Sequence, residues 1–560
     1  MLGNGVCEAE CYTALCDFDH ADCVNSTHPL SVFVSPAAAA PFLGTTVFPY
    51  QSLYQALSTV SAKYLNIYLL AGVHTLDSTQ NYDLLAKSSA LGITISSAQA
   101  PAVLQLTPFP AYFNVTMPLT VSNVRIQGGF SLKPDCFSST CTYCPALTQD
   151  LLTGQWQNDR NQYINPSNYA EKSLCDAYLS YVLFSVQSEV PFSLVNVTFA
   201  NIQHQPLALV QSQCGLISLH NVTFTNITVQ SLGLRNGVIQ WVRLKSREPY
   251  YCGSFSYETG TVELLNNGYE FNGQSNFSGF AYFSAIKLVF FSNVQFLYNN
   301  MFTGLEVSAS SSSLIFIEEM RETHISKCTF KGNVADVGGA IYINSAVTIP
   351  IESQNGISKE HNLVHVWIEN SVFEGNSARI GAAVHISFTD EHQNVWVDNC
   401  SFVGNVAWER EVLGVSSPFV TGNMAVGRTE TILQGGLIVT VRIPPAYVKF
   451  TNLRIEGNIA PYFTYNQHIG VYQISNTSFI GNGELSGTTV NPVLAAFINH
   501  PSSYVSLSVE TGIFITCQNM VFIDTALDVS IRFLDFFSGY CPSGSSGITV
   551  SQGLEKVTTR

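Results

Sequence analysis

Charged residues are scarce in this chain. Only 11% of its 560 residues are charged, against about a quarter in an ordinary soluble domain. Lysine and arginine together number 24 and aspartate and glutamate 39, so the formal net charge is −15 at pH 7. A deficit of basic residues disfavours nucleic-acid phosphates and anionic lipid headgroups as partners. The composition therefore predicts no nucleic-acid partner and an acidic surface suited to a cation-rich extracellular medium.

Long hydrophobic runs are also missing, although 46% of the residues are hydrophobic. A membrane-spanning helix needs roughly 20 consecutive apolar residues. The apolar residues of this chain fall instead in short runs, such as 67–70 and 288–291, which Asn, Ser, Thr and Gly interrupt. We therefore expect no direct insertion into a membrane, and a large core assembled from many short segments.

The first residues, Met1-Leu2-Gly3-Asn4, lack the basic start and the apolar stretch of a secretory signal. If the protein is secreted, this chain begins after processing or is an excerpt of a longer product. Secretion is favoured by Asn-x-Ser/Thr glycosylation acceptors, because a glycan coat would supply the solubility that charge does not. A chain rich in Asn, Ser and Thr also produces some acceptors by chance. The eight acceptors are Asn25, Asn114, Asn196, Asn221, Asn226, Asn276, Asn399 and Asn476.

The 14 cysteines are even in number and partly clustered. Clusters in a chain with glycosylation acceptors indicate disulfides in an oxidising compartment, which predicts a secreted or cell-surface protein. The clustered residues are Cys7, Cys11, Cys16 and Cys23 at the start, and Cys136, Cys141, Cys144 and Cys175 in a cysteine-rich insertion near residues 130–180. Cys141 and Cys144 have the spacing of half a zinc site, but no second pair matches, so disulfides are favoured there. Cys328 and Cys400 lie inside repeats and fit buried free thiols equally well.

A pattern of the form Asn-x-x-Phe recurs along the chain. Its copies begin at Asn196, Asn221, Asn293, Asn370, Asn399, Asn476 and Asn519, with degenerate copies at Asn123, Lys327 and Asn452. A second Asn usually follows the Phe, namely Asn201, Asn226, Asn299, Asn333, Asn376, Asn405, Asn458 and Asn482. Several neighbouring copies are 24, 25 or 29 residues apart, a length typical of one coil of a solenoid.

The segments between the copies are short and rich in β-formers, as in 364–368 and 437–441, and they lack a helical period. One coil cannot bury its apolar face alone, so stacking would place each Phe above the last. The repeat Asn tolerates a left-handed turn, and stacked Asn side chains can bond from coil to coil. The chain is therefore predicted to be all-β, a parallel β-helix solenoid.

The start of the solenoid is predicted to carry a cap. Residues 50–64 have the pattern of an amphipathic helix, which would cover the core and the strand edges of the first coil. Its apolar stripe consists of Leu53, Leu57, Val60 and Tyr64. The first strands would be 31–34 and 66–70. We expect three parts: a disulfide module at 1–24, the β-helix at 25–545 and a C-terminal tail at 546–560.

Two stretches resemble the paired FxxN and GGA[ILV] motifs of the chlamydial polymorphic membrane proteins. One is Phe330-Lys331-Gly332-Asn333 followed by Gly338-Gly339-Ala340-Ile341, and residues 373–376 with 381–384 form a looser pair. Similar repeats occur in pectin-lyase-like β-helix proteins of protists. The resemblance covers roughly residues 123–524. It implies a right-handed parallel β-helix on a cell surface, without the membrane barrel of an autotransporter, for which no room remains before Arg560.

Residues 3–23 resemble the later part of a Notch-type (LNR) repeat, NGxCxxxCNxxxCxxDGGDC. The resemblance implies a small disulfide module around one Ca²⁺, with Asp19 and Asp22 as acidic ligands and a Cys7–Cys23 bridge. Tyr12 stands where the family has Asn, and His20-Ala21 replaces Gly-Gly. Two upstream cysteines of the family pattern are absent, so Cys11 and Cys16 could pair with each other. A calcium module and a disulfide knob without metal both remain open, and no other cofactor is expected.

Catalytic patterns were sought because pectate lyases and polygalacturonases share the β-helix. The NTD, DD, GHG and RIK motifs of the hydrolases are absent from the sequence, and acidic residues are scattered. His365 and His385, in consecutive predicted coils, could stack as a reactive or metal-binding pair or be ordinary strand histidines. Trp367 and Trp396 occupy equivalent repeat positions and could form a sugar-stacking platform or pack in the core.

Three functional hypotheses follow. The favoured one is a non-enzymatic structural or adhesive extracellular glycoprotein of a cell surface, appendage or filament, whose partners are copies of itself or other surface proteins. The second is a carbohydrate-binding module, for which an aromatic-lined groove without acids would speak. The third is a polysaccharide lyase or hydrolase, for which a cleft lined by convergent acids would speak.

Overall fold

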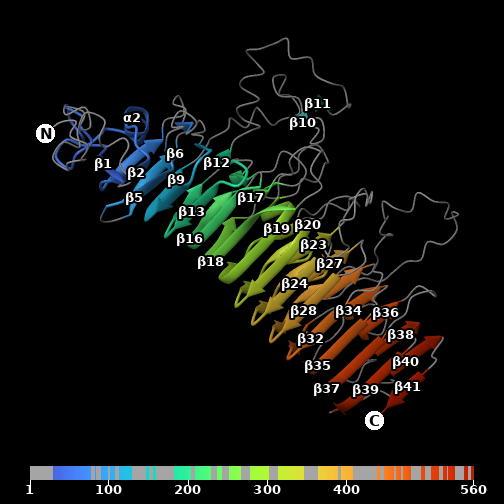
Figure 1. Cartoon of the computed structure of the whole chain (residues 1–560). Coiled ribbons are helices and arrows are strands. Elements are labelled where there is room, and N and C mark those ends of the chain that lie inside the picture. Colours follow the sequence, from blue (N-terminus) through green and yellow to red (C-terminus); the bar gives the residue numbers. More distant parts are fainter. Residues whose placement is uncertain are drawn as a thin grey trace, which may run out of the picture. The chain divides into compact units, whose positions relative to one another are not determined.

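The computed structural model describes residues 29–76, 82–83, 90–98, 101–106, 113–128, 147–149, 156–158, 182–202, 208–212, 214–228, 236–241, 251–265, 278–301, 313–345, 364–388, 393–407, 438–441, 447–458, 462–467, 471–480, 493–498, 506–515, 521–525, 528–536, 548–552 and 556–559. The chain divides into two compact units, residues 1–267 and 268–560, and each is described by itself. In both units the strands of one coil pair in parallel with those of the next, as Figure 1 shows. The fold is a right-handed parallel β-helix, as predicted.

Each coil of the first unit contributes strands to three parallel faces, named A, B and C in chain order. Face A contains β1 (Leu30–Val34), β2 (Tyr64–Leu69), β5 (Gly92–Ser97), β8 (Leu119–Ser122), β13 (Pro191–Val195) and the first parts of β16 (Leu216–Thr228) and β18 (Cys252–Leu265). Face B contains β3 (Val73–Leu76), β6 (Ala102–Leu106), β9 (Val124–Gly128), β14 (Thr198–Ile202) and the later parts of β16 and β18. Face C contains β4 (Tyr82–Asp83), β7 (Phe113–Val115), β12 (Val182–Val186), β15 (Ala208–Ser212) and β17 (Asn236–Trp241). Inside the predicted cysteine-rich insertion, β10 (Leu147–Gln149) pairs antiparallel with β11 (Trp156–Asn158).

The second unit has the same order of faces. Face A contains the middle of β19 (Ser278–Leu297), the later part of β20 (Ile315–Ser326), β24 (Val364–Glu369), β28 (Gln393–Asp398), β32 (Tyr447–Thr451), the first parts of β35 (Val471–Ile480), β37 (Ser506–Ile515) and β39 (Asp528–Phe536), and β41 (Lys556–Thr559). Face B contains the end of β19, β21 (Thr329–Lys331), β25 (Val372–Glu374), β29 (Ser401–Val403), β33 (Arg454–Glu456) and the later parts of β35, β37 and β39. Face C contains the starts of β19 and β20, β23 (Ile341–Ser345), β27 (Val384–Phe388), β31 (Ile438–Val441), β34 (Tyr462–Gln467), β36 (Val493–Ile498), β38 (Val521–Thr525) and β40 (Ile548–Gln552). A short fourth sheet holds β22 (Val334–Val337), β26 (Ser377–Ile380) and β30 (Val406–Ala407).

The repeat phenylalanines stack inside face B, as the sequence predicts. In the second unit Phe296, Phe330, Phe373 and Phe402 are fully buried. Their ring centroids follow one another at 4.8, 4.9 and 4.8 Å, with interplanar angles of 1°, 5° and 3°. Phe199 and Phe224 form the equivalent pair of the first unit at 4.9 Å. Each stacked pair adds about 0.5–1.5 kcal/mol beyond the burial of apolar area.

The predicted copy at Asn519 is wrong. Phe522 lies on face C, where its register partners are Ala496 and Thr549. The Phe register of face B continues instead from Phe479 to Phe514 and Phe536. A motif of two residues cannot distinguish one face from another when strands of similar composition occur on all three.

The first Asn of each repeat lies at the corner between faces A and B, in the left-handed backbone region. The φ angles range from 46° to 55° at Asn123, Asn196, Asn221, Asn293, Asn370, Asn399, Asn452 and Asn476, and Lys327 adopts 54°. Asn bears this conformation at lower cost than other residues with a side chain. The prediction of a left-handed turn residue is therefore confirmed.

The second Asn of the repeat occupies two different positions. It follows the Phe by two residues in the first unit, where Asn201 and Asn226 have left-handed backbones and Asn226 Nδ2 donates to Asn201 Oδ1 at 2.5 Å. It follows by three in the second unit, where the left-handed position belongs to Tyr298 or to the glycines 332, 375, 404 and 457. This shift of one residue turns the Asn side chain inward.

The inward asparagines of the second unit form a buried ladder, with Nδ2 donating to Oδ1 of the next coil. The distances are 2.8 Å from Asn299 to Asn333, 2.9 Å from Asn333 to Asn376, and 3.0 Å from Asn376 to Asn405 and from Asn405 to Asn458. Each Oδ1 also accepts a backbone N–H, and Nδ2 of the last four also donates to a carbonyl oxygen of the Phe column. Every polar atom of these buried amides is therefore hydrogen-bonded.

The predicted capping helix exists but is shorter than expected. Helix α2 spans Leu53–Thr59, and its first turn is capped by Ser52, whose Oγ accepts from Gln55 N at 3.1 Å. Leu53, Ala56 and Leu57 are buried, which confirms most of the stripe. The assignment of Tyr64 to the stripe is wrong, because this residue begins β2 and is 39% exposed. Among the described residues, no helix combines the length and hydropathy needed to cross a bilayer.

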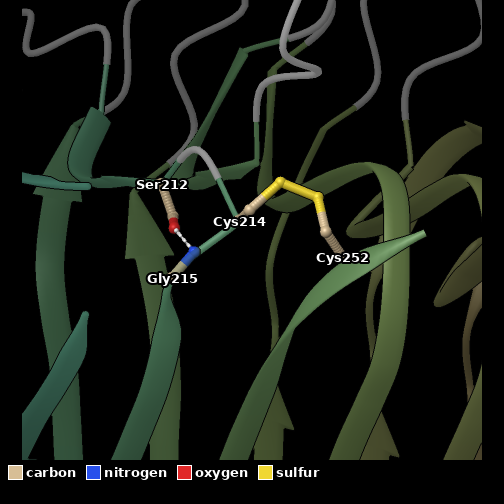
Figure 2. Close-up of a disulfide and its surroundings, with 4 residues drawn as sticks. All are labelled: Ser212, Cys214, Gly215 and Cys252. Atoms are coloured by element: carbon tan, nitrogen blue, oxygen red, sulfur yellow. Dashed lines mark hydrogen bonds between the residues drawn. A yellow bond between two sulfur atoms is a disulfide. The ribbon is translucent and has the colours of Figure 1, made fainter. Parts of the chain in front are cut away.

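A disulfide that the cysteine pattern did not reveal joins two coils of the first unit. Cys214 precedes β16 and Cys252 begins β18, and Figure 2 shows their sulfur atoms bonded across the turns. Leu216 pairs with Ser254, so both cysteines stand two residues before the same register position. Beside them, Ser212 Oγ accepts the Gly215 N–H at 2.8 Å. Cys328 and Cys400 are buried free thiols, as predicted, and burial raises the pKa of each to about 12.

Removing this disulfide should destabilise the first unit. The bridge spans a sequence separation of 38 residues, for which loop-closure entropy gives about 4 kcal/mol. The double variant Cys214→Ser with Cys252→Ser should therefore unfold at lower urea concentration than the parent. Adding reductant should lower the parent to the level of the variant and leave the variant unchanged. Equal midpoints for the oxidised parent and the variant would contradict this expectation.

Candidate functional site

Some predicted site residues lie outside the described residues, namely Asp19, Asp22, Asn25, Asn276 and all eight clustered cysteines, Cys7, Cys11, Cys16, Cys23, Cys136, Cys141, Cys144 and Cys175. The described acceptors are Asn114 on face C, Asn226 at the end of face B, and Asn196, Asn221, Asn399 and Asn476 at the corner between faces A and B. In the described part of the chain, no three His, Cys, Asp or Glu side chains converge on a possible metal position.

The predicted tryptophans lie on the outer side of face A in the second unit. Trp367 pairs in register with Trp396, and both side chains are half-buried. They alternate with buried Val366, Ile368 and Val395, which point inward. Packing of the tryptophans in the core, one of the two predicted alternatives, is therefore wrong.

The tryptophans stack along the coils instead of forming an open platform. His324, in the preceding coil, lies 4.2 Å from Trp367 between ring centroids at an interplanar angle of 19°. Trp396, in the following coil, lies 5.0 Å away at 41°. Both faces of the Trp367 ring are thus covered by neighbouring rings, and a sugar would meet mainly edges. The column stabilises the coils, at about 0.5–1.5 kcal/mol per pair.

Two carboxylates on the same outer side are held by hydrogen bonds. Glu369 and Asp398 are register partners on adjacent coils. Glu369 Oε1 accepts from Ser326 Oγ at 2.9 Å, and Asp398 Oδ1 accepts from Thr451 Oγ1 at 2.5 Å and from Asn452 Nδ2 at 2.8 Å. These two residues are an in-register pair of acids on this face, beside the aromatic column.

The predicted pairing of His365 with His385 is wrong. His365 lies on β24 of face A, near Asn394 Nδ2, which is 3.2 Å from His365 Nδ1. His385 lies on β27 of face C and is 6% exposed. Residues 20 apart are separated by less than one coil, since the register partner of His365 is Asn394, 29 residues along. Partial burial lowers the pKa of His365.

His385 makes the second unit sensitive to acid. Its Nδ1 has no hydrogen-bond partner among the described residues, and burial lowers the pKa of the imidazole to about 3, from 6.5. Between pH 6.5 and about 3, the unfolded chain binds a proton that the folded chain excludes. Stability is therefore complete above pH 6.5 and should fall with decreasing pH by about 1.4 kcal/mol per unit.

The measurement compares the parent with His385→Leu in urea titrations from pH 7 to pH 4. Their difference in unfolding free energy should change with pH, because only the parent carries this histidine. The exposed-side variant His324→Leu is the matched control and should follow the parent. A pH-independent difference between the parent and His385→Leu would refute a buried neutral imidazole.

A shallow groove lies on the outer side of face A in the first unit. Its volume is about 280 Å³, and it is lined by Pro29, Tyr64, Asn66, Gly92, Ile93, Thr94, Pro118 and Thr120. This volume lies just below the range of about 300–1,000 Å³ that holds drug-sized ligands. The groove therefore suits one small ring or a short segment of a longer molecule.

The strand register explains how the groove forms. Tyr64 begins β2 and lies opposite Gly92, the first residue of β5. A Cβ atom at Gly92 would lie 3.6 Å from the Tyr64 ring, so the absence of a side chain leaves the space beside the ring empty. Asn66, Thr94 and Thr120 are consecutive register partners and place an amide and two hydroxyls along the groove. The proline rings at 29 and 118 complete the apolar part.

The groove combines an aromatic ring with uncharged hydrogen-bonding groups. Tyr64 is 39% exposed, unlike Trp367, whose ring faces are covered. No residue that lines the groove is acidic or basic. Sequence reasoning missed this site because Tyr64 was assigned to the helix and Gly92 carries no chemical signal. Its groups can stack against an apolar ring face and bond to hydroxyls, which is the chemistry of a neutral sugar.

Comparisons with known proteins identify one segment by family. The family model described as the LNR domain of Notch matches residues 1–24, which confirms the predicted resemblance of that segment. The search of curated proteins found no match to this chain. None of these matches supports the predicted resemblance of the repeats to polymorphic membrane proteins.

Several solved structures resemble the chain at low sequence identity. The catalytic domain of a GH87 α-1,3-glucanase in complex with nigerose is 11% identical, with coverage of 90% of this chain and 67% of that chain and a TM-score of 0.33. The receptor-binding domain of the siphovirus 9NA tailspike is 8% identical, with coverages of 91% and 76% and a TM-score of 0.26. The pectate lyase Pel9A is 10% identical, with coverages of 93% and 82% and a TM-score of 0.24.

Proposed function

We propose that the protein is a non-catalytic extracellular β-helix that binds neutral carbohydrate in the groove around Tyr64, in keeping with an adhesive role. The observation that carries the proposal is an exposed tyrosine ring beside Gly92, above a row of amide and hydroxyl groups. An aromatic-lined groove without acids is what the sequence analysis required of a carbohydrate-binding surface.

The charge of the chain bears on the class of carbohydrate. A net charge of −15 repels anionic uronates, and the groove supplies no basic side chain to offset that repulsion. Neutral hexose oligomers avoid this cost. They present both an apolar ring face for Tyr64 and hydroxyls for Asn66, Thr94 and Thr120.

Truncation of the tyrosine should weaken binding. We expect Tyr64→Ala to reduce the affinity for neutral gluco-, manno- or galacto-oligosaccharides at least tenfold, about 1.4 kcal/mol, because the ring supplies the stacking surface. Gly92→Val should weaken binding as strongly, since its side chain fills the space beside an intact Tyr64. Titration calorimetry on an array-selected oligosaccharide measures both effects.

The matched control is Tyr298→Asn, which removes a tyrosine that is 60% exposed at a left-handed position and should leave binding unchanged. Equal affinities for the parent, Tyr64→Ala and Gly92→Val would exclude this groove as the site. The absence of any neutral-oligosaccharide binding would exclude the proposed function itself.

Polysaccharide processing is the second candidate, and it rests on the register pair Glu369 and Asp398. Paired carboxylates on one face can act as acid and base in glycoside hydrolysis. Under this alternative, the protein releases reducing ends from a neutral polysaccharide, and Glu369→Gln or Asp398→Asn abolishes the release. Binding without release, lost in Tyr64→Ala and retained in Glu369→Gln, supports the non-catalytic function.

The remaining expectations are part of the same proposal. A location outside the cell, with disulfides in both cysteine clusters, is supported by the LNR match at residues 1–24. Calcium bound by Asp19 and Asp22 of that segment remains a proposal, which calcium titration of the full chain with and without Asp22→Asn tests. Assembly into filaments and contacts with other surface proteins likewise remain predictions.

A further inference from the structure

Four glycosylation acceptors share one structural position. Asn196, Asn221, Asn399 and Asn476 all lie at the corner between faces A and B, with left-handed backbones and exposed side chains. The other described acceptors, Asn114 and Asn226, are half-buried and lie elsewhere in the coil. The corner therefore collects the exposed acceptors of each unit in a single file.

The amide nitrogen of each corner acceptor is already a donor. In the first unit, Nδ2 of Asn196 donates to Asn123 Oδ1 at 3.0 Å, and Nδ2 of Asn221 to Asn196 Oδ1 at 2.8 Å. In the second unit, Nδ2 of Asn399 donates to Asn370 Oδ1 at 2.8 Å, and Nδ2 of Asn476 to Asn452 Oδ1 at 2.6 Å. All four bonds run towards the preceding coil, so one N–H is used and one is left.

Glycosylation consumes only one of these two N–H groups. The co-reactant is an oligosaccharide activated by a diphosphate leaving group. A bond forms between Nδ2 and the anomeric carbon, the bond from that carbon to the diphosphate oxygen breaks, and Nδ2 loses one proton. The product is a secondary amide, which strongly prefers the trans form, with its remaining N–H opposite to the C=O.

The retained N–H has the direction that the corner ladder uses. In a ladder of stacked amides, the C=O and the donating N–H of one side chain point in opposite directions along the stack. A trans secondary amide preserves that arrangement, and the sugar leaves from the other position on nitrogen. Because the side chains are exposed, solvent lies on the side where the sugar emerges.

We propose that N-glycans attach to the corner asparagines Asn196, Asn221, Asn399 and Asn476, forming a one-sided file on each unit while the amide ladder stays intact. This inference rests on the extracellular location proposed above. It is independent of the carbohydrate-binding groove. The glycans would shield one corner of the coil and leave the outer sides of the faces uncovered for partners.

The occupancy test uses the full chain secreted from a glycosylating eukaryotic cell. Enzymatic deglycosylation in ¹⁸O water, followed by peptide mass spectrometry, marks each occupied Asn. We expect the mark at the four corner acceptors and none at Asn370 or Asn452, which share the corner without an acceptor sequence. Bare corner sites beside occupied Asn114 or Asn226 would overturn this inference alone. Six bare sites would overturn the extracellular glycoprotein as well.

Three variants separate the glycan from the ladder. Ser401→Ala removes the acceptor sequence and keeps Asn399, so it should lose one glycan and keep the hydrogen exchange of the neighbouring coil unchanged. Asn399→Gly tolerates the φ of 48° but loses both glycan and ladder bond. Asn370→Gly loses the ladder bond only. We expect faster amide exchange around residue 370 in both Gly variants. Faster exchange in the glycosylated parent than in Ser401→Ala would show that the sugar breaks the ladder and would refute its retention.

Discussion

Asn376→Leu should open the second unit locally at a cost of about 4 kcal/mol. The parent side chain is fully buried, and its Oδ1 accepts the backbone N–H and an Nδ2 N–H of Asn333 at 3.1 and 2.9 Å. Its Nδ2 donates to the Phe330 carbonyl at 2.9 Å. Leucine leaves two donors of Asn333 and one carbonyl unsatisfied in the core. Each such group costs about 1–3 kcal/mol.

Native-state hydrogen exchange is the suitable measurement, because a stack of coils can open in parts and need not unfold in one step. Protection should fall most at residues 333 and 405, on either side of the substitution. The control is Asn370→Gly, which removes an amide of the exposed corner and should cost less than about 1 kcal/mol. Equal losses in the two variants would contradict a special role for the buried ladder.

Phe373→Ala should destabilise the same coils by about 4 kcal/mol. The ring is fully buried between Phe330 at 4.9 Å and Phe402 at 4.8 Å. Its removal leaves a cavity that neighbouring coils cannot close, because their backbone ladders fix the spacing. Phe→Ala substitutions in well-packed cores cost about 3–5 kcal/mol.

The matched control is Phe290→Ala, at the start of the outer aromatic column. That ring is half-buried and touches His324 only at 6.4 Å and 49°, so we expect a loss near 1 kcal/mol. Urea unfolding with hydrogen exchange of the second unit measures both variants. Comparable losses for Phe373→Ala and Phe290→Ala would mean that the internal stack contributes no more than the surface column.

The repeat could be predicted because it obeys short-range rules. Asn at a left-handed corner and Phe three residues later satisfy backbone sterics and burial in every coil, so the pattern survives in the sequence. The distinction between Asn201 and Asn333 was missed, because it depends on one residue of offset from the Phe. That offset decides whether the amide meets solvent or the core.

The candidate site could not be predicted for a different reason. Tyr64, Gly92 and Thr120 come from three coils, and their approach depends on the register of β2, β5 and β8. The Cys214–Cys252 bridge has the same origin, since the two residues are neighbours only through the pairing of β16 with β18. In contrast, the tryptophans were found from their spacing, although stacking of their ring faces was not.

The sequence by itself determined a parallel β-helix with stacked Phe and Asn positions, because each coil repeats the same local requirements of turn geometry and burial. It also marked a Notch-type module at residues 1–24. Only the tertiary structure decided which outward residues remain available to a ligand. Insertions change the sequence distance between coils from 24 to 53 residues while the register stays constant. Outward positions are therefore set by pairing across coils, and side chains such as Trp367 and Tyr64 differ in what lies above and below them.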